Sequence, residues 1–357
     1  MPDKIQLEVN GRLFDGWKSL NITEAMEQLS GKFDFSLYDK EDTASRFIRA
    51  GSACRLYIVD GLTGARINVL KGYVDKTKQK LSGKSSEMSI SGRDRTGDVV
   101  DCSAVHRSNT WLNARFSTIC KDLVAPYGLL VDKVDLLEDN RIERFTLQNG
   151  ESSFSAIERL CMDQGVLPDH TIDGDLKLTY TAPESKRAAE DLEAGVNILE
   201  VEKEDKWNQR YSNYVVKGQG TNKGRAWTGK NTRLFASAED LSITRNRPFL
   251  FMSENRATAD NLVRRVAWEA QVRAGRGTTY KVKVKDWFQK DRNGTNVRPW
   301  SINERVYLTV TRWDVFNQLL ITGVNRKLDE SSSRVTVLTL KHPETYKANP
   351  SQKVKLS

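Results

Sequence analysis

The sequence predicts a β-rich α+β protein in which two similar antiparallel β-barrel domains accompany a small inserted α+β domain. Two-residue alternation of apolar and polar side chains fills the first part of the chain and returns near its end. Helical spacing of apolar residues is confined to three stretches between those parts. Barrels are expected rather than open sheets because closure removes exposed strand edges.

The chain has 357 residues, more than one hydrophobic core usually supports, so several domains are expected. We assign residues 1–101 to the first β-barrel domain and residues 102–182 to an α+β insert of two helices and a hairpin. The second β-barrel domain spans residues 183–345 and is interrupted by a loop and helix insert at about 218–276. Residues 346–357 contain lysine and proline without periodicity and are expected to be a flexible tail.

The first domain is identified by its strands and hairpins. Ile5, Leu7 and Val9 share one strand face and are followed by an Asn-Gly turn. Residues 70–101, LKGYVDKTKQKLSGKSSEMSISGRDRTGDVVD, are predicted to form a strand, a turn, a second strand and a sharp exit. Residues 76–86 are rich in lysine and polar side chains, so we expect a long exposed turn there.

Three helices are expected. The first begins at Thr110 as N-cap and ends before Gly128, and the second runs from about Ser153 to a stop at Gly165. The third lies between residues 257 and 274, with Gly275 expected as its stop. The apolar stripe predicted for this third helix consists of Leu262, Val263, Val266, Ala267 and Ala270.

The cysteines and histidines indicate neither a disulfide framework nor a zinc site. Cys54, Cys102, Cys120 and Cys161 stand far apart among apolar neighbours, so we expect reduced core residues in a cytosolically made protein. The three histidines have no helical or hairpin spacing, so zinc is not expected. No apolar run approaches the roughly 18 residues of a membrane span, and no basic and apolar leader begins the chain. Membrane insertion and Sec-type export are therefore not expected.

The formal charge of +9 is a mild bias for a chain with 47 acidic residues. A well-solvated surface explains it better than a dedicated nucleic-acid face. In the strand TTYKVKVKDW, however, Lys281, Lys283 and Lys285 lie on one face and apolar side chains on the other. This lysine ladder must face water, a lumen or an acidic partner.

A repeated layout connects the two halves. The segments RLYI and RVYL contain Tyr57 and Tyr307, which precede Gly72 by 15 residues and Gly323 by 16. Each glycine is followed by a polar turn and a closing strand. Chance similarity between two β-meanders is one explanation, and two barrels of similar build is the one that we favour.

The sequence contains one enzyme-like signature, GRAWTGK at residues 224–230, which fits the frame of a phosphate-binding loop. Asn231 stands where that loop needs Ser or Thr, Trp227 is bulky, and no convincing helix follows. A plain exposed loop is the better interpretation. Since no nucleophile, acid-base or dinucleotide motif is found, we expect no enzymatic activity and no cofactor.

Several of these stretches resemble the tail baseplate hub proteins of Mu-like contractile phages. The resemblance rests on GYVDKTKQK followed by SISGRDRTGDVVDCSA, on SSFSAIERLCMDQG with DGDLKLTY, and on WEAQVRAGRGTTYKVKV. It covers nearly the whole chain. More distantly the layout is similar to the hub of T4-like phages and to the hub part of type VI secretion spike proteins.

The resemblance implies a homotrimeric virion protein of the tail baseplate, assembled in the host cytoplasm. Three chains with two similar barrels each would form a ring that faces a six-fold tail tube and a three-fold central spike. Its expected partners are the tail tube protein, the spike protein and other baseplate proteins, with transient passage of DNA. The alternative function is a nucleic-acid-binding β protein that uses the lysine ladder and the basic run at 218–233.

Overall fold

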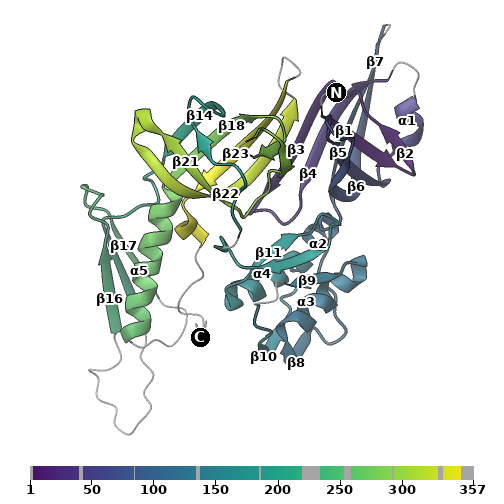
Figure 1. Ribbon diagram of the computed structural model, residues 1–357. Helices are drawn as coiled ribbons and strands as arrows, with labels where there is room; N and C mark the ends of the chain where they lie inside the picture. The colour runs from purple at the N-terminus through teal and green to yellow at the C-terminus, as the bar shows by residue number, and fades with distance from the viewer. Residues whose placement is uncertain are drawn as a thin grey trace.

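The computed structural model describes residues 3–39, 43–83, 85–133, 137–184, 186–218, 234–252, 259–291, 293–328 and 333–346 (Figure 1). The chain begins with a β-rich part that contains one short helix, α1 (Thr43–Phe47). Its strands are β1 (Lys4–Val9), β2 (Arg12–Phe14), β3 (Ser19–Ala25), β4 (Lys32–Tyr38), β5 (Ala53–Val59), β6 (Arg66–Ser82) and β7 (Ser85–Asp94).

The insert follows β7 and has its own hydrophobic core, in which α3 and α4 pack against short strands. Its helices are α2 (Gly97–Asp101), α3 (Phe116–Val124), η1 (Ala125–Tyr127) and α4 (Ser153–Gln164). Its strands are β8 (Thr110–Arg115), β9 (Val131–Lys133), β10 (Arg141–Thr146), β11 (Leu167–His170) and β12 (Leu176–Thr179). In Figure 1 the insert lies below the junction of the two β-rich parts.

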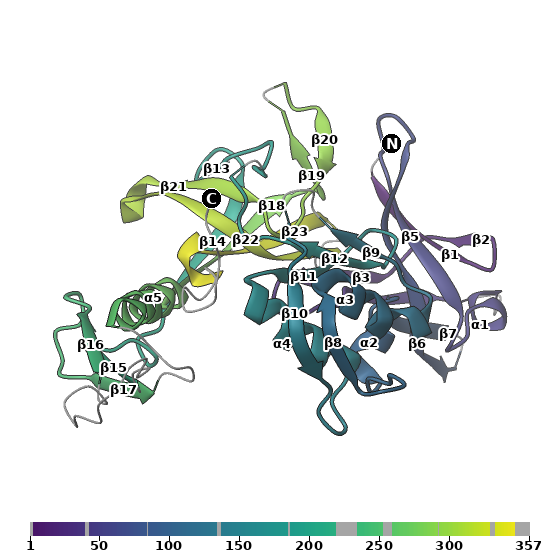
Figure 2. The same ribbon diagram turned by 90° about the horizontal axis from the view of Figure 1, so that it is seen from below.

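The second β-rich part resumes after the insert. Its strands are β13 (Leu192–Glu193), β14 (Ile198–Asp205), β18 (Thr278–Lys285), β19 (Phe288–Lys290), β20 (Asn296–Pro299), β21 (Arg305–Val310), β22 (Val315–Leu328) and β23 (Arg334–Lys341). Two short turns are η2 (Thr311–Trp313) and η3 (Pro343–Tyr346). A side lobe projects from this part (Figures 1 and 2) and consists of β15 (Asn213–Gly218), β16 (Leu234–Glu239), β17 (Pro248–Met252) and α5 (Ala259–Arg276).

One continuous sheet connects the two β-rich parts. Its 13 strands include the path β14-β18-β23-β22-β3-β4-β7-β6-β5-β1-β2, while β21 pairs with β22 and with β13. The predicted β-rich class is therefore right, but the described strands do not close into two separate barrels. The physical reason is that β22 pairs with β23, β21 and β3 at once, so that β3 of the first half extends the sheet of the second half.

The same strand order occurs twice in this sheet. In the first half the order is β3-β4-β7-β6-β5-β1, and in the second it is β14-β18-β23-β22-β21-β13. Each strand of the first series has its counterpart in the second series at the same place along the chain. One pairing differs, because β1 is antiparallel to β5 whereas β13 is parallel to β21. The repeated layout seen in the sequence is thus a repeat of sheet topology.

Several expected local structures are wrong. Residues 110–115 form β8 rather than the first helical turn, because they pair with β10 and the helix begins only at Phe116. Residues 76–82 continue β6 instead of forming a long turn, although their side chains are largely exposed as expected. Residues 343–346 form the turn η3, which packs against α5. Residues 347–357 of the expected tail lie outside the described residues. The second predicted helix is confirmed, since Ser152 caps α4 and Gly165 ends it.

Two further corrections concern buried positions. Cys102 is exposed, whereas the other three cysteines are buried and all four are free. In α5 the buried residues include Leu262, Val266 and Val272, while Val263 of the predicted stripe is 57% exposed. Gly275 lies inside α5 rather than after it. Ala267 of the predicted stripe is exposed as well, whereas Leu262, Val266 and the partly buried Ala270 pack in the core that α5 shares with β15 and β16.

We expect Gly92→Ala to destabilise the first half strongly. A Cβ atom there would lie 2.1 Å from the backbone oxygen of Tyr73 and 2.6 Å from the ring of Phe33. Overpacking of this kind costs about 1–3 kcal/mol, and about 1 kcal/mol lowers Tm by about 2–4 °C in domains of this size. Gly323→Ala is the matched control, because its nearest atoms are side-chain atoms of Thr339 at 3.3 Å. Equal thermal shifts for the two variants would contradict this packing.

Candidate functional site

One face of the continuous sheet is polar and crosses both halves. Successive strands place polar side chains opposite one another on this face, and apolar side chains on the other face form the two main cores. Two surface hollows lie on it, one over β14, β18, β22, β23 and the adjacent β3, and the other over β3, β4, β6 and β7. These hollows involve counterpart strands of the two halves. The polar face is therefore the surface that the internal repeat duplicates.

The predicted lysine ladder lies on this polar face. Lys281 and Lys285 are exposed and Lys283 is half-buried. On the neighbouring strand β14, Glu202 is opposite Lys281 and Glu200 is opposite Lys283. Opposite charges across an antiparallel pair attract and partly neutralise one another. The ladder thus belongs to a surface that carries both positive and negative side chains. Such a surface is less suited to binding duplex DNA than a row of lysines without acidic neighbours.

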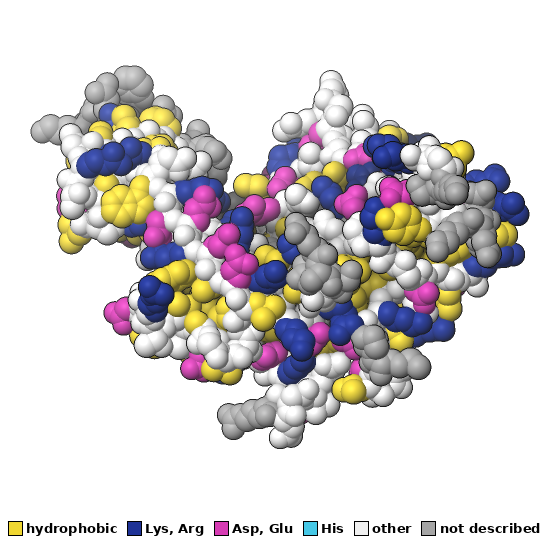
Figure 3. All heavy atoms as spheres, turned by 90° about the horizontal axis from the view of Figure 1, so that it is seen from above, with side chains coloured by type: hydrophobic (Ala, Val, Ile, Leu, Met, Phe, Trp, Pro, Cys, Tyr) yellow, Lys and Arg dark blue, Asp and Glu magenta, His cyan; other side chains and the backbone are white. Residues whose placement is uncertain are grey.

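Charges elsewhere on the surface are also mixed. On the face shown in Figure 3, acidic and basic side chains are interspersed over the middle of the molecule. Basic side chains gather at the right-hand end, which belongs to the first half of the chain. A surface with both signs avoids tight, nonspecific binding of polyanions.

The two halves are joined by a buried ion pair. Arg326 on β22 is 2% exposed and donates from Nη1 to Oε1 of Glu24 on β3 at 3.0 Å. The same guanidinium also donates to the backbone oxygen of Trp300. Because β22 and β3 are adjacent strands from different halves, this pair fixes the seam of the sheet.

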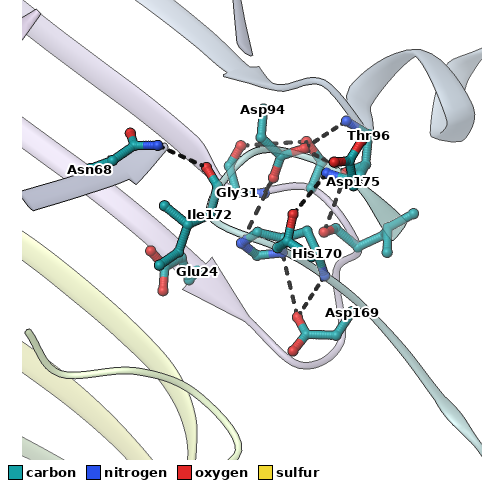
Figure 4. Close-up of polar contacts among 12 residues, drawn as sticks. Glu24, Gly31, Asn68, Asp94, Thr96, Asp169, His170, Ile172 and Asp175 are labelled. Atoms are coloured by element: carbon teal, nitrogen blue, oxygen red, sulfur yellow. Dashed lines mark hydrogen bonds and ion pairs between the residues drawn. The ribbon is translucent and has the colours of Figure 1, made fainter. Parts of the chain in front are cut away.

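The insert meets that seam through His170 at the end of β11 (Figure 4). Its Nε2 lies 3.8 Å from Asp94 of β7, and its Nδ1 lies 3.5 Å from Asp169. Burial alone would lower the pKa of His170, but the carboxylates of Asp94, Asp169 and Glu24 outweigh burial and raise it. Protonated His170 therefore binds the insert electrostatically to the first half.

This junction is built by Gly92, Arg93, Asp94 and Thr96, here called the GRD-T motif. Asp94 is buried and accepts hydrogen bonds from the backbone N–H of Gly31 at 2.6 Å and of Thr96 at 2.8 Å (Figure 4). Arg93 pairs with Asp75 at 2.7 Å and with Asp101 at 2.6 Å. The motif therefore fixes the exit from β7 into the insert and serves a structural purpose.

Sequence reasoning missed the charged residues of the junction, although a signal for two of them exists. Glu24 falls in step with Leu20 and Ile22, which are buried on the core side of β3. Arg326 likewise falls in step with Val324 on β22. A charge at an inward-facing strand position is costly unless it is paired. One acidic and one basic residue at such positions therefore predict an ion pair between them.

Other candidates from the sequence give no site here. Residues 224–230, which hold the GRAWTGK signature, and nearly all of the basic run at 218–233 lie outside the described residues. Within the described ranges no group of three or more histidine, cysteine or acidic residues is arranged to hold a metal ion. None of the described helices is long and apolar enough to cross a membrane.

Comparisons with known proteins assign a class to this fold. Residues 4–94 match the model of the N-terminal domain of Mu phage baseplate assembly protein GpP-like proteins. Residues 96–180 match the second domain of gp44-like baseplate hub proteins. The β-rich first half and the insert thus match two domain models of phage baseplate proteins.

Whole-chain relatives agree with the domain matches. The baseplate hub protein gp44 of Escherichia phage Mu is 27% identical over 353 residues, which is 97% of this chain and 89% of the relative. The 43 kDa tail protein of prophage MuSo2 from Shewanella oneidensis has 26% identity and a TM-score of 0.80, with coverage of 97% and 99%. The chain is therefore similar to Mu-type baseplate hub proteins over nearly its whole length.

A more distant solved structure shares the fold alone. An E. coli component of the type VI secretion system is 11% identical, with a TM-score of 0.58 over 96% of this chain and 79% of that one.

We expect the contribution of His170 to stability to depend on pH. Because its folded pKa is raised above 6.5, the stabilisation is fully present below about pH 6.5 and is lost as pH rises through the folded pKa. The Tm difference between the wild type and His170→Gln should therefore shrink between about pH 6 and pH 9. A difference that stays constant or grows over this range would contradict the ionic role.

We expect Arg326→Met to destabilise the seam by about 3–5 kcal/mol, because Glu24 would remain buried without its partner. Adding Glu24→Leu in the same chain removes the unpaired charge and should recover a large part of the loss. Thermal melts of the two single variants and the double variant measure this coupling. Additive losses would show that the two side chains do not depend on each other.

Proposed function

We propose that the chain is a non-enzymatic, homotrimeric hub whose ring of six similar sheet units joins the tail tube to the central spike. The observation that carries this proposal is the strand order that occurs twice in one sheet. A trimer of a twofold-repeated chain gives six similar units in a three-fold assembly. Such a ring matches a six-fold tube on one side and a three-fold spike on the other.

The polar sheet face supports a further part of the proposal, the passage of DNA. Its lysines at 281 and 283 lie beside glutamates on β14. A channel wall that lets a polyanion pass needs mixed charge, since a strongly basic wall would bind phosphates. We infer that this face lines the channel and that the lysine ladder faces its lumen. No cofactor takes part in this function.

The surfaces of the parts suggest different roles in assembly. The two halves build the ring, whereas the insert and the side lobe are free to contact other baseplate proteins. Exposed apolar side chains on the side lobe support this, among them Phe235, Leu250 and Met252, which are 58–73% exposed. The domain limits assigned from the sequence, 1–101, 102–182 and 183–345, are kept as part of this proposal.

We expect the purified chain to have three times its monomer mass of 40.5 kDa. Size-exclusion chromatography with light scattering, run at several protein concentrations, measures this mass directly. Arg326→Met, which perturbs the seam within a chain, should weaken the trimer, while an exposed insert variant such as Glu158→Lys should not. A mass that stays at one chain at high concentration would overturn the proposal.

A further inference from the structure

Two strand edges of the chain lack a contact that the internal repeat would lead one to expect. Inside the chain, β22 pairs antiparallel with β3, for example Asn325 with Thr23. The counterpart of β22 is β6 and the counterpart of β3 is β14. The same contact could therefore form a second time, between β6 and β14. Within one chain it does not, because the two strands lie at distant places in the sheet.

The edge of β14 is open among the described strands. Among the named strands β14 pairs with β18 alone and ends the path of the sheet, while Ile198 at its start also forms a bridge with Ala194. It is eight residues long and mostly exposed. A long exposed edge strand carries unpaired backbone N–H and C=O groups and is a template for another strand.

The outer part of β6 has the complementary open edge. From Lys76 to Ser82, β6 pairs with β7 on one side and with no other described strand. In the first half of the chain, β5 covers β6 only as far as Tyr73. The hairpin of β6 and β7 extends beyond its neighbours, as Figure 1 shows at the upper right.

The two edges have opposite charges on the same face of the sheet. β14 presents Glu200, Glu202 and Glu204, all exposed, beside β18 residues of the polar face. β6 presents Lys76, Lys78 and Lys80, all exposed, beside β7 residues of the same face. Alternate residues of a strand share one face, so antiparallel pairing would set three glutamates against three lysines.

We propose that β14 of one subunit pairs antiparallel with residues 76–82 of β6 in the next subunit, so that a glutamate row meets a lysine row. The partner is a second copy of this chain. This inference rests on the proposed ring. If the contact is repeated between all three subunits, the sheet closes and every β14 edge and every β6 edge is paired. Charge complementarity fixes the partner, since β14 against β14 or β6 against β6 would oppose like charges.

Residues 76–82 already pair with β7 on one side, and the proposed contact would give them a neighbouring strand on the other side. With a neighbouring strand, their backbone groups gain hydrogen bonds and their lysines gain acidic partners. Since the pairs are at the surface, the association should weaken as ionic strength rises.

Charge reversal tests the proposal. Reversing the glutamate row with Glu200→Lys, Glu202→Lys and Glu204→Lys, or the lysine row with the corresponding Lys→Glu changes, should raise the subunit concentration at half-dissociation by at least about tenfold. A chain that carries both reversals should regain the trimer. The matched control, Asp132→Lys with Glu143→Lys and Glu158→Lys, makes the same charge change in the insert and should leave assembly unchanged.

Disulfide trapping tests the geometry in a Cys102→Ser background. Glu202→Cys is combined in one chain with Lys76→Cys, Lys78→Cys or Lys80→Cys, and oxidation should trap one combination efficiently, because bonded Cα atoms lie about 4.4–6.8 Å apart. Moving the first cysteine from residue 202 to residue 200 should move the best partner two residues later on β6. Gln79→Cys, on the opposite face, is the negative control.

The outcomes separate this inference from the proposed function. A covalent ladder that ends at three chains, with rescue by the double reversal, supports the pairing. A wild-type trimer that resists both reversals and gives no disulfide overturns the pairing but leaves the ring. A wild-type monomer overturns the ring, and a ladder that continues beyond three chains overturns its closure.

Discussion

The architecture depends on the pairing of β22 with β3, which joins the two halves into one sheet. The buried ion pair between Arg326 and Glu24 lies at this seam and has little exposed surface on either side chain. Removing one member would leave an uncompensated charge in the core. The pair therefore makes the two halves depend on each other.

The same seam couples to the insert. His170 lies between Asp94 and Asp169, and Glu24 adds to the negative potential around it. One chain of charges thus runs from the second half through the first half into the insert. The GRD-T motif contributes Asp94 to this chain and Arg93 to the exit from β7. Its residues are explained by the need to hold three parts of the molecule in fixed relation.

Much of the architecture could be predicted from local patterns. Alternation revealed most long strands, helical spacing and caps revealed α4, and the spacing of Tyr57 and Gly72 beside that of Tyr307 and Gly323 indicated the repeat. What failed depended on tertiary pairing. Residues 110–115 have helical spacing but pair with β10, and residues 76–82 look like a turn but pair with β7. The prediction of closed barrels depends on the cost of exposed strand edges. A protein can also avoid this cost by pairing the edge strands of neighbouring subunits.

The lysine ladder was recognised from the sequence, but its acidic neighbours on β14 were not, because they are distant in the chain. We propose that three chains form one ring with a continuous sheet. A cryo-EM reconstruction of the purified oligomer without imposed symmetry tests this arrangement. We expect three subunits, six similar sheet units and unbroken pairing of β14 with β6 across each boundary. Subunits in contact only through the insert or the side lobe would contradict it.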